Sequence, residues 1–212
     1  MGFVIAVDGP AASGKGTIAT RLAALYGYPV LDSGLLYRAV GVRVLAEGGD
    51  LSDMDHATRV ALTLDPATLE NPEVRTRAAG EAASRVAAYT PVREALRQFQ
   101  RTFAAQEPGV VIDGRDIGTV IAPQADAKLF VTATPEVRAT RRWKQLTGQG
   151  EAVAYEDILA DIRIRDERDS ARSDSPMVIA ADAVLLDTTE MDIDRAFDAA
   201  RRIVEAARAR GS

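Results

Sequence analysis

The first seventeen residues hold the feature that most constrains the fold of this chain. The apolar run Phe3–Val7 has the length and composition of a buried parallel strand. A glycine-rich stretch, Asp8–Thr17, follows it, and then an amphipathic pattern places Ile18, Leu22 and Leu25 on one face of a helix. In a strand–loop–helix unit of this kind, backbone N–H groups and the positive end of the helix dipole surround an anion. The start of the chain therefore predicts a binding site for the phosphates of a nucleoside triphosphate.

The predicted phosphate loop has an uncommon ending. In the commonest form a Ser or Thr directly follows the lysine and binds Mg2+, whereas here Gly16 separates Lys15 from Thr17. We therefore assign no direct metal ligand, and Thr17 could reach Mg2+ through a bound water. A glycine-rich turn that only joins a strand to a helix is disfavoured, because loop, lysine and flanking elements agree. The residues expected to bind ATP are Gly9, Pro10, Ala11, Ala12, Ser13, Gly14, Lys15, Gly16 and Thr17.

Length and composition limit the classes of protein to which the chain can belong. Its 212 residues suffice for one domain with insertions and a full hydrophobic core. There is no long apolar span and no signal-peptide pattern, and the absence of cysteine suits a reducing compartment. A net charge of −5 argues against a nucleic-acid-binding surface. We expect a cytoplasmic monomer that binds neither nucleic acid nor membrane.

Short apolar runs predict the remaining strands at residues 28–31, 110–113, 127–132 and 183–186. Ser33, after the first of these, could cap a helix or face a ligand, and the spacing favours neither. Between the first two runs, helical patterns around 59–64, 73–88 and 92–105 predict a helical insertion over about 41–107. Asp113 ends an apolar strand, which is where acids that orient Mg2+ or its waters lie in nucleotide-binding folds. Asp113 is therefore a second candidate for water-mediated contact with Mg2+.

The predicted helix over about 155–171 carries a charged face. Arg165, Arg168, Asp169 and Arg172 fall at the spacing that places them on one side of a helix. A salt-bridged surface helix is the alternative, with Asp161 and Asp166 as partners. We favour a catalytic lid over about 148–172, because arginines bind phosphate oxygens bidentately and the chain already has a phosphate loop.

Taken together, these motifs resemble the bacterial cytidylate (CMP) kinase family over almost the whole chain. The Gly-Lys-Gly-Thr ending is shared with nucleoside monophosphate kinases in general, whereas the Asp-Ser-Gly, Gly-Arg-Asp and arginine-helix motifs together are more specific. The matching blocks are Asp8–Thr17, Leu31–Arg38, Ala82–Ala88, Val92–Leu96, Asp113–Thr119 and Arg165–Arg172.

The resemblance implies an α/β fold of the P-loop NTPase type. A parallel five-stranded sheet with helices on both faces would form the core, at about 1–40, 108–147 and 173–212. A helical insertion for the nucleoside monophosphate and a mobile lid would be added to this single domain. The segment Leu64–Thr76 departs from the family's longer members, since it is shorter than the β-hairpin-rich piece they carry.

The resemblance also implies roles for individual residues. Lys15, Arg115, Arg168 and Arg172 would be catalytic, and ATP would act as its Mg2+ complex. The set that binds CMP would comprise Ser33, Arg38, Ser84, Arg93, Arg115, Asp116, Arg165, Asp169 and Arg172. The implied reaction is phosphoryl transfer from Mg-ATP to CMP or dCMP, in pyrimidine nucleotide metabolism.

Two alternatives differ from this interpretation in testable ways. The first is the same chemistry on another monophosphate, such as UMP or AMP, which would change only the residues that read the base. The second is a nucleotide-binding switch that signals to a partner. It is disfavoured because the guanine-binding Asn-Lys-x-Asp motif is absent and because converging arginines have no evident use in a switch.

Overall fold

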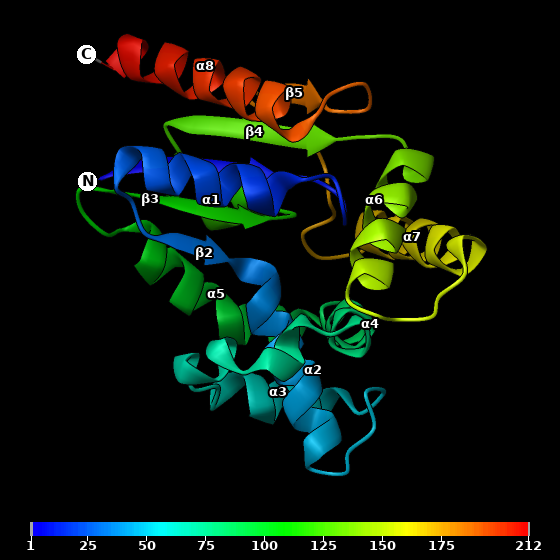
Figure 1. The fold of residues 1–212 in the computed structure, drawn as a ribbon. Helices are drawn as coiled ribbons and strands as arrows, with labels where there is room; N and C mark the ends of the chain where they lie inside the picture. The colour runs from blue at the N-terminus through cyan, green and yellow to red at the C-terminus, as the bar shows by residue number, and fades with distance from the viewer. Residues whose placement is uncertain (1, 212) are drawn as a thin grey trace. The chain divides into compact units, whose positions relative to one another are not determined.

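The computed structural model describes residues 2–211 (Figure 1). The strands are β1 (Phe3–Asp8), β2 (Val30–Asp32), β3 (Gly109–Gly114), β4 (Ala127–Thr132) and β5 (Val184–Asp187). The helices are α1 (Lys15–Tyr26), α2 (Ser33–Ala46), α3 (Met54–Leu62), α4 (Arg77–Val86), α5 (Thr90–Ala104), α6 (Pro135–Gly148), α7 (Tyr155–Ser170) and α8 (Ile193–Gly211). Short 3-10 segments lie at η1 (Pro66–Glu70) and η2 (Pro72–Arg75), and a π-helical turn lies at η3 (Ile117–Ile121).

The five strands form one sheet in the order β2-β3-β1-β4-β5, which confirms the predicted α/β fold. β1 pairs in parallel with β3 and β4, and β4 pairs in parallel with β5. Side chains of β1, β4 and β5 form a core with those of α1 and α8, which include Leu22, Leu129, Leu186 and Val204. The loops that follow the carboxyl ends of β1, β3 and β4 consequently emerge along one edge of the sheet, where doubly wound folds bind ligands.

The chain divides into two compact units, one of residues 1–31 and 106–212 and one of residues 32–105. The insertion over about 41–107 stays a prediction, and most of its residues belong to the second unit. This unit is helical, and α2, α3, α4 and α5 pack around a core of small and aliphatic side chains such as Leu36, Val60, Val86 and Leu96. The segment Leu64–Thr76 contains η1 and η2, and α4 begins only after Thr76 because the Thr76 hydroxyl accepts from the N–H of Ala79.

Around residue 30, the predicted strand was wrong in detail, and one of the two alternatives left open for Ser33 is excluded. β2 spans Val30–Asp32 rather than 28–31, although the Pro29 carbonyl already accepts from the N–H of Val111. The cap of α2 is Asp32, whose carboxylate accepts from the N–H of Gly34 at 2.9 Å, and Ser33 is the first residue of the helix. A capping role for Ser33 is therefore excluded.

Helices α6 and α7 pack against each other through a small core of their own in the first unit. Ala139 and Leu146 of α6 contact Ile158 and Ile162 of α7, and Trp143 is partly buried against this cluster. The Trp143 Nε1–H donates to the carbonyl of Val153 at 3.1 Å, which satisfies the polar group of the indole ring. Within residues 2–211, no helix is long and apolar enough to cross a membrane.

Candidate active site

The phosphate loop connects the end of β1 to the start of α1, as the sequence predicts. Its backbone needs glycine at Gly9, where φ is +145° and an added Cβ would lie 2.0 Å from the carbonyl oxygen of Val131 on β4. Gly14, the N-cap of α1, has φ +93°, a left-handed conformation that glycine adopts without strain. These two residues let the loop pass close to the sheet and turn directly into the helix, whose first N–H groups have no partner within the helix.

Lys15 and Asp113 come together beside this loop. The Lys15 Nζ lies 3.6 Å from an Asp113 carboxylate oxygen, and the Asp113 side chain is only 3% exposed. The two residues meet because Asp113 lies near the end of β3, the strand that pairs with β1. Carboxylate and hydroxyl oxygens are the ligand types that Mg2+ prefers, so Asp113 and Thr17 fit the expected Mg2+ of Mg-ATP. Within residues 2–211, no group of three or more acidic, His or Cys side chains is placed to hold a metal by itself.

Asp169 organises a second cluster in the same unit. Its carboxylate is fully buried and accepts from the Arg115 Nε at 2.9 Å. It also accepts from Arg172, and the Arg165 Nε lies 3.9 Å away. Burial acts to raise the pKa of Asp169, but the charges of Arg115, Arg172 and Arg165 outweigh it and hold that pKa below its ordinary value. One buried carboxylate thus gathers three arginines.

This cluster bears on the choice between a lid and a salt-bridged surface helix. Arg165 and Asp169 lie on α7, and Arg172 lies just after the helix ends. The carboxylate that Arg115, Arg165 and Arg172 contact belongs to Asp169, which is itself part of the predicted charged face. Arg168 lies one turn after Arg165 on α7 and is partly buried. Its catalytic role remains a prediction.

Sequence reasoning missed the arginine that joins α7 to the phosphate loop. The guanidinium of Arg138, on α6, donates to both carboxylate oxygens of Asp166 at 3.0 and 2.5 Å. It also donates to the carbonyls of Ala133 at 2.9 Å and of Ala11 at 3.2 Å. One buried side chain thus fixes a helix of the predicted lid and the loop that would hold ATP. No pattern in the sequence indicates this bond, because Asp166 equally fits a surface ion pair on its own helix.

Arg141, one turn further along α6, has a related structural role. Its guanidinium donates to the carbonyl of Ser13 at 3.2 Å, to the hydroxyl and carbonyl of Thr188 and to the carbonyl of Met191. These bonds tie the phosphate loop to the segment that follows β5. They indicate that Arg141 supports the loop through its backbone.

We expect Arg138→Lys to lower the free energy of unfolding by about 1–2 kcal/mol, because the ammonium group of lysine cannot make all the hydrogen bonds that the planar guanidinium group makes. The KM for ATP should rise, since the loop loses its support at Ala11. Arg201→Lys on α8 is the matched control, because Arg201 makes an exposed pair with Glu205 at 2.8 Å. Equal effects of the two variants in chemical unfolding and ATP titrations would contradict this prediction.

The second unit contains four of the residues that the resemblance assigns to CMP, whereas Asp116, which is also buried, lies in the first unit. Ser33, Ser84 and Arg93 are buried, and the Arg93 guanidinium lies 5.8 Å from the centre of the Tyr37 ring. Arg38 donates to the carbonyls of Val74 and Thr76, each at 3.0 Å. The side chains are therefore held in place by their own unit, and their contact with CMP stays a prediction.

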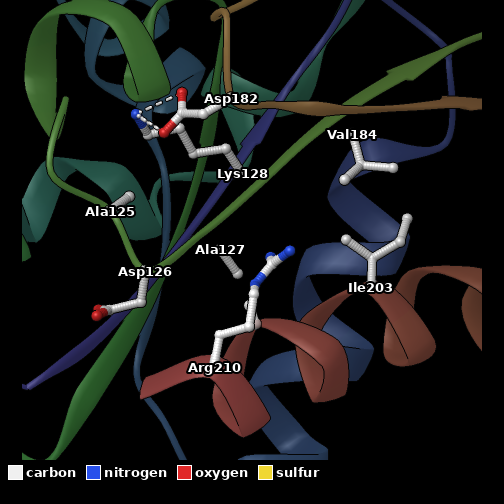
Figure 2. A pocket seen from close by; sticks show the side chains of 9 residues that line it. Ala125, Asp126, Ala127, Lys128, Asp182, Val184, Ile203 and Arg210 are labelled. Carbon is white, nitrogen blue, oxygen red and sulfur yellow. Dashed lines mark hydrogen bonds and ion pairs between the residues drawn. The ribbon is translucent and has the colours of Figure 1, made fainter.

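A cavity of about 330 Å3 lies elsewhere in the first unit, where β4 begins (Figure 2). Lys128 lines it and donates to Asp182 at 2.8 Å, and Arg210 of α8 points toward it. Because the phosphate loop follows the carboxyl end of β1, this cavity is at the opposite edge of the sheet and is separate from the candidate site.

Comparison with known proteins adds independent support for the resemblance. The family model described as cytidylate kinase matches residues 5–206. A cytidylate kinase of Caulobacter vibrioides is 72% identical over 210 residues, which cover 99% of each chain. One of Xanthobacter autotrophicus is 65% identical over 207 residues, covering 98% of this chain and 99% of that one. An uncharacterised protein of Eubacterium ventriosum, of known structure, is 16% identical with a TM-score of 0.57, covering 96% of this chain and 98% of that one, and supports the fold alone.

Proposed function

This chain belongs to the cytidylate kinase family, and from that premise we propose that its phosphate loop and the arginines around Asp169 transfer a phosphoryl group from ATP to CMP or dCMP. The enzyme is a CMP/dCMP kinase. The observation that carries the proposed site is the gathering of Arg115, Arg165 and Arg172 on one buried carboxylate, in the unit that also holds Lys15. A positive cluster of this kind suits two substrates that both carry phosphates.

The chemistry needs charge neutralisation more than it needs a base. The acceptor is a phosphate monoester, which is already anionic near neutral pH, so no proton has to be removed from the nucleophile. The main barrier is the approach of this anion to the anionic γ-phosphate. Lys15, Arg115 and Arg172 would offset that repulsion and hold the two phosphates in line, with Arg168 as a further cation. Bound with ATP, Mg2+ supplies additional neutralisation of phosphate charge, and Asp113 and Thr17 would orient its waters.

The residues that the resemblance assigns to CMP have three proposed tasks, which are binding of the phosphate, of the sugar and of the base. Arg115 and Arg172, together with Arg38, are proposed to bind the CMP phosphate, and Arg165 and Asp169 the sugar. Base reading is assigned to Ser33, Ser84, Arg93 and Asp116. Burial of Ser33, Ser84, Arg93 and Asp116 supports this assignment, because buried polar groups that read a base discriminate strongly against a base that leaves them without a partner. We further propose that the enzyme acts as a cytoplasmic monomer.

The test is an ADP-release assay with Mg-ATP and each of CMP, dCMP, UMP, AMP, GMP and dTMP. Turnover confined to CMP and dCMP is the expected result. Strong turnover with a different monophosphate would keep the chemistry but overturn the base-reading set. ATP hydrolysis that no monophosphate stimulates would favour the nucleotide switch, the less supported alternative.

We expect Asp116→Ala to narrow the preference for CMP over UMP by about five- to a hundredfold, because an exocyclic amine left without its acceptor costs about 1–3 kcal/mol. The ratio of kcat/KM for the two acceptors measures this. Asp126→Ala is the matched control. Asp126 directly precedes the start of β4, at the edge of the sheet away from the phosphate loop, and accepts from the N–H of Val4 at 2.7 Å. A CMP:UMP ratio that stays at the wild-type value in a folded Asp116→Ala protein would remove Asp116 from the base-reading set.

A further inference from the structure

Asp8, at the end of β1, makes an unusual pair of hydrogen bonds. Its carboxylate is 5% exposed, and its two oxygens accept from the backbone N–H groups of Ile117 at 2.8 Å and of Gly118 at 2.7 Å. A strand residue thereby binds two consecutive amides of a turn more than a hundred positions later in the chain. Since both bonds are charge-assisted and shielded from water, they are stronger than ordinary amide–carbonyl bonds.

The turn that Asp8 holds begins immediately after Arg115 and Asp116. Directly after them, the π-helical turn η3 closes on the backbone carbonyl of Asp116, which accepts from the N–H groups of Val120 at 2.8 Å and Ile121 at 3.2 Å. Such turns are rare and are frequently found at functional sites. Asp8 binds the first two amides of this turn, so its carboxylate fixes the backbone from which the Asp116 side chain projects.

Close packing leaves the turn little freedom to shift. A Cβ added at Gly118 would lie 3.2 Å from the Lys128 Cδ and 3.3 Å from the Asp8 carboxylate, so only glycine fits there without displacing a neighbour. Lys128 is itself anchored, because its ammonium group donates to the Pro123 carbonyl at 2.7 Å and to Asp182 at 2.8 Å. The turn is thus held between an acid of β1 and a lysine of β4.

This arrangement has an electrostatic cost. Burial raises the pKa of Asp8 from 3.8 to about 6, although the amides of Gly118 and Ile117 and the charge of Arg115 act in the opposite direction. The nearby charge of Asp116 adds to the increase. A group buried at such a cost, and absent from the catalytic set, calls for a role other than stability alone.

We propose that Asp8 is a positioning residue for acceptor selection, whose carboxylate holds the backbone at Ile117 and Gly118 so that Asp116 meets the base of the acceptor in the correct place. The inference rests on the proposed function of Asp116. Asp8 touches neither substrate in this scheme and acts only through the turn. A misplacement of about 1 Å in an active site lowers the reaction rate by up to a hundredfold. A loosened turn should therefore affect discrimination between CMP and UMP more than it affects binding of ATP.

The test compares Asp8→Asn with Asp126→Asn. The first variant keeps the shape of the side chain but replaces one acceptor oxygen with an NH2 group that would face a backbone N–H. The second alters a carboxylate that contacts the other end of β1, where Asp126, just before β4, accepts from the N–H of Val4 at 2.7 Å. For Asp8→Asn we expect the CMP:UMP ratio of kcat/KM to fall about ten- to a hundredfold, and the KM for ATP to change far less. Asp126→Asn should leave both quantities at wild-type values.

A purely structural role predicts a different result. If Asp8 only orders the phosphate loop that follows it, Asp8→Asn would raise the KM for ATP and leave the CMP:UMP ratio unchanged, and the proposal would be overturned. Wild-type protein without turnover of CMP would instead overturn the proposed function, so the two failures can be told apart.

A second measurement uses the wild-type protein and does not depend on the folding of a variant. The amide resonances of Ile117 and Gly118 should titrate together with an apparent pKa of about 6, in step with Asp8. The CMP:UMP ratio of kcat/KM should fall as the pH is lowered through this range, because a protonated Asp8 carboxyl group accepts hydrogen bonds from the two amides less well. The phosphate groups of CMP and UMP titrate alike and cancel in the ratio. A ratio that stays constant while the two amides titrate would contradict the proposal.

Discussion

Arg115→Ala should lower kcat with CMP by about a thousandfold, the size of effect seen when a phosphate-stabilising arginine or a transition-state hydrogen-bond donor is removed. Two donor atoms of this side chain are bound to the protein, the Nε to Asp169 at 2.9 Å and an Nη to the Gly114 carbonyl at 3.2 Å. These bonds fix the plane and direction of the guanidinium before substrate arrives. The side chain is 13% exposed, so its charge acts where water screens it poorly.

Stability should respond much less than turnover. After Arg115→Ala, Asp169 keeps its bond to Arg172 and its proximity to Arg165, so the buried carboxylate remains compensated. Single-turnover kinetics with CMP, together with thermal unfolding, separate the two effects. The control is Arg163→Ala on α7, which removes an exposed arginine paired with Glu136 at 2.8 Å. Arg115→Ala protein that folds and turns over CMP at the wild-type rate would eliminate its catalytic role.

The parts of the fold that were predicted well are those fixed by short-range patterns. β4 was predicted with its observed bounds, because an apolar run ends at charged and proline-containing turns. The phosphate loop and the start of α1 were located from the glycine spacing together with Lys15 and the apolar patterns on either side. The start of α4 was placed too early, since a helical composition gave no sign that η2 would end at Arg75 and that Thr76 would cap the helix. Such boundaries depend on single hydrogen bonds.

In the candidate site, too, residues marked by short-range patterns were predicted, whereas contacts between distant segments were missed. Lys15 and Asp113 were each singled out from the pattern around a predicted strand, and the structure places them 3.6 Å apart, a contact that the sequence analysis did not predict. The bonds from Asp8 to Ile117 and Gly118, and those from Arg138 to Asp166, were missed. Both depend on how segments distant in the chain pack together, and neither residue spacing nor composition contains that information. The missed residues position others, whereas those that were found carry the charge that phosphates require.

Asp169→Asn should be the most destabilising of the substitutions considered, because it removes the buried negative charge that Arg115, Arg165 and Arg172 all contact. At pH 7 we expect the free energy of unfolding to fall by about 3–5 kcal/mol, the usual cost of leaving a buried charge without its partner. Turnover should fall as well, since Arg115 and Arg172 would repel each other out of their present positions. Equilibrium unfolding in urea measures the first effect, and CMP kinetics the second.

The pH dependence of this loss follows from the direction of the shift. The pKa of Asp169 lies below its ordinary value of 3.8 in the folded protein, because the charges of Arg115, Arg172 and Arg165 overcome the effect of burial. Its contribution to stability is therefore present in full above the unfolded pKa and is lost as pH falls through the folded one. The stability difference between wild type and Asp169→Asn should stay constant from pH 7 down to about 5 and close below pH 4. Glu136→Gln, which removes an acid from the exposed pair with Arg163, should produce a much smaller difference across the same series. A gap for Asp169→Asn that persists unchanged at pH 3 would show that the carboxylate does not balance the charges of the arginine cluster.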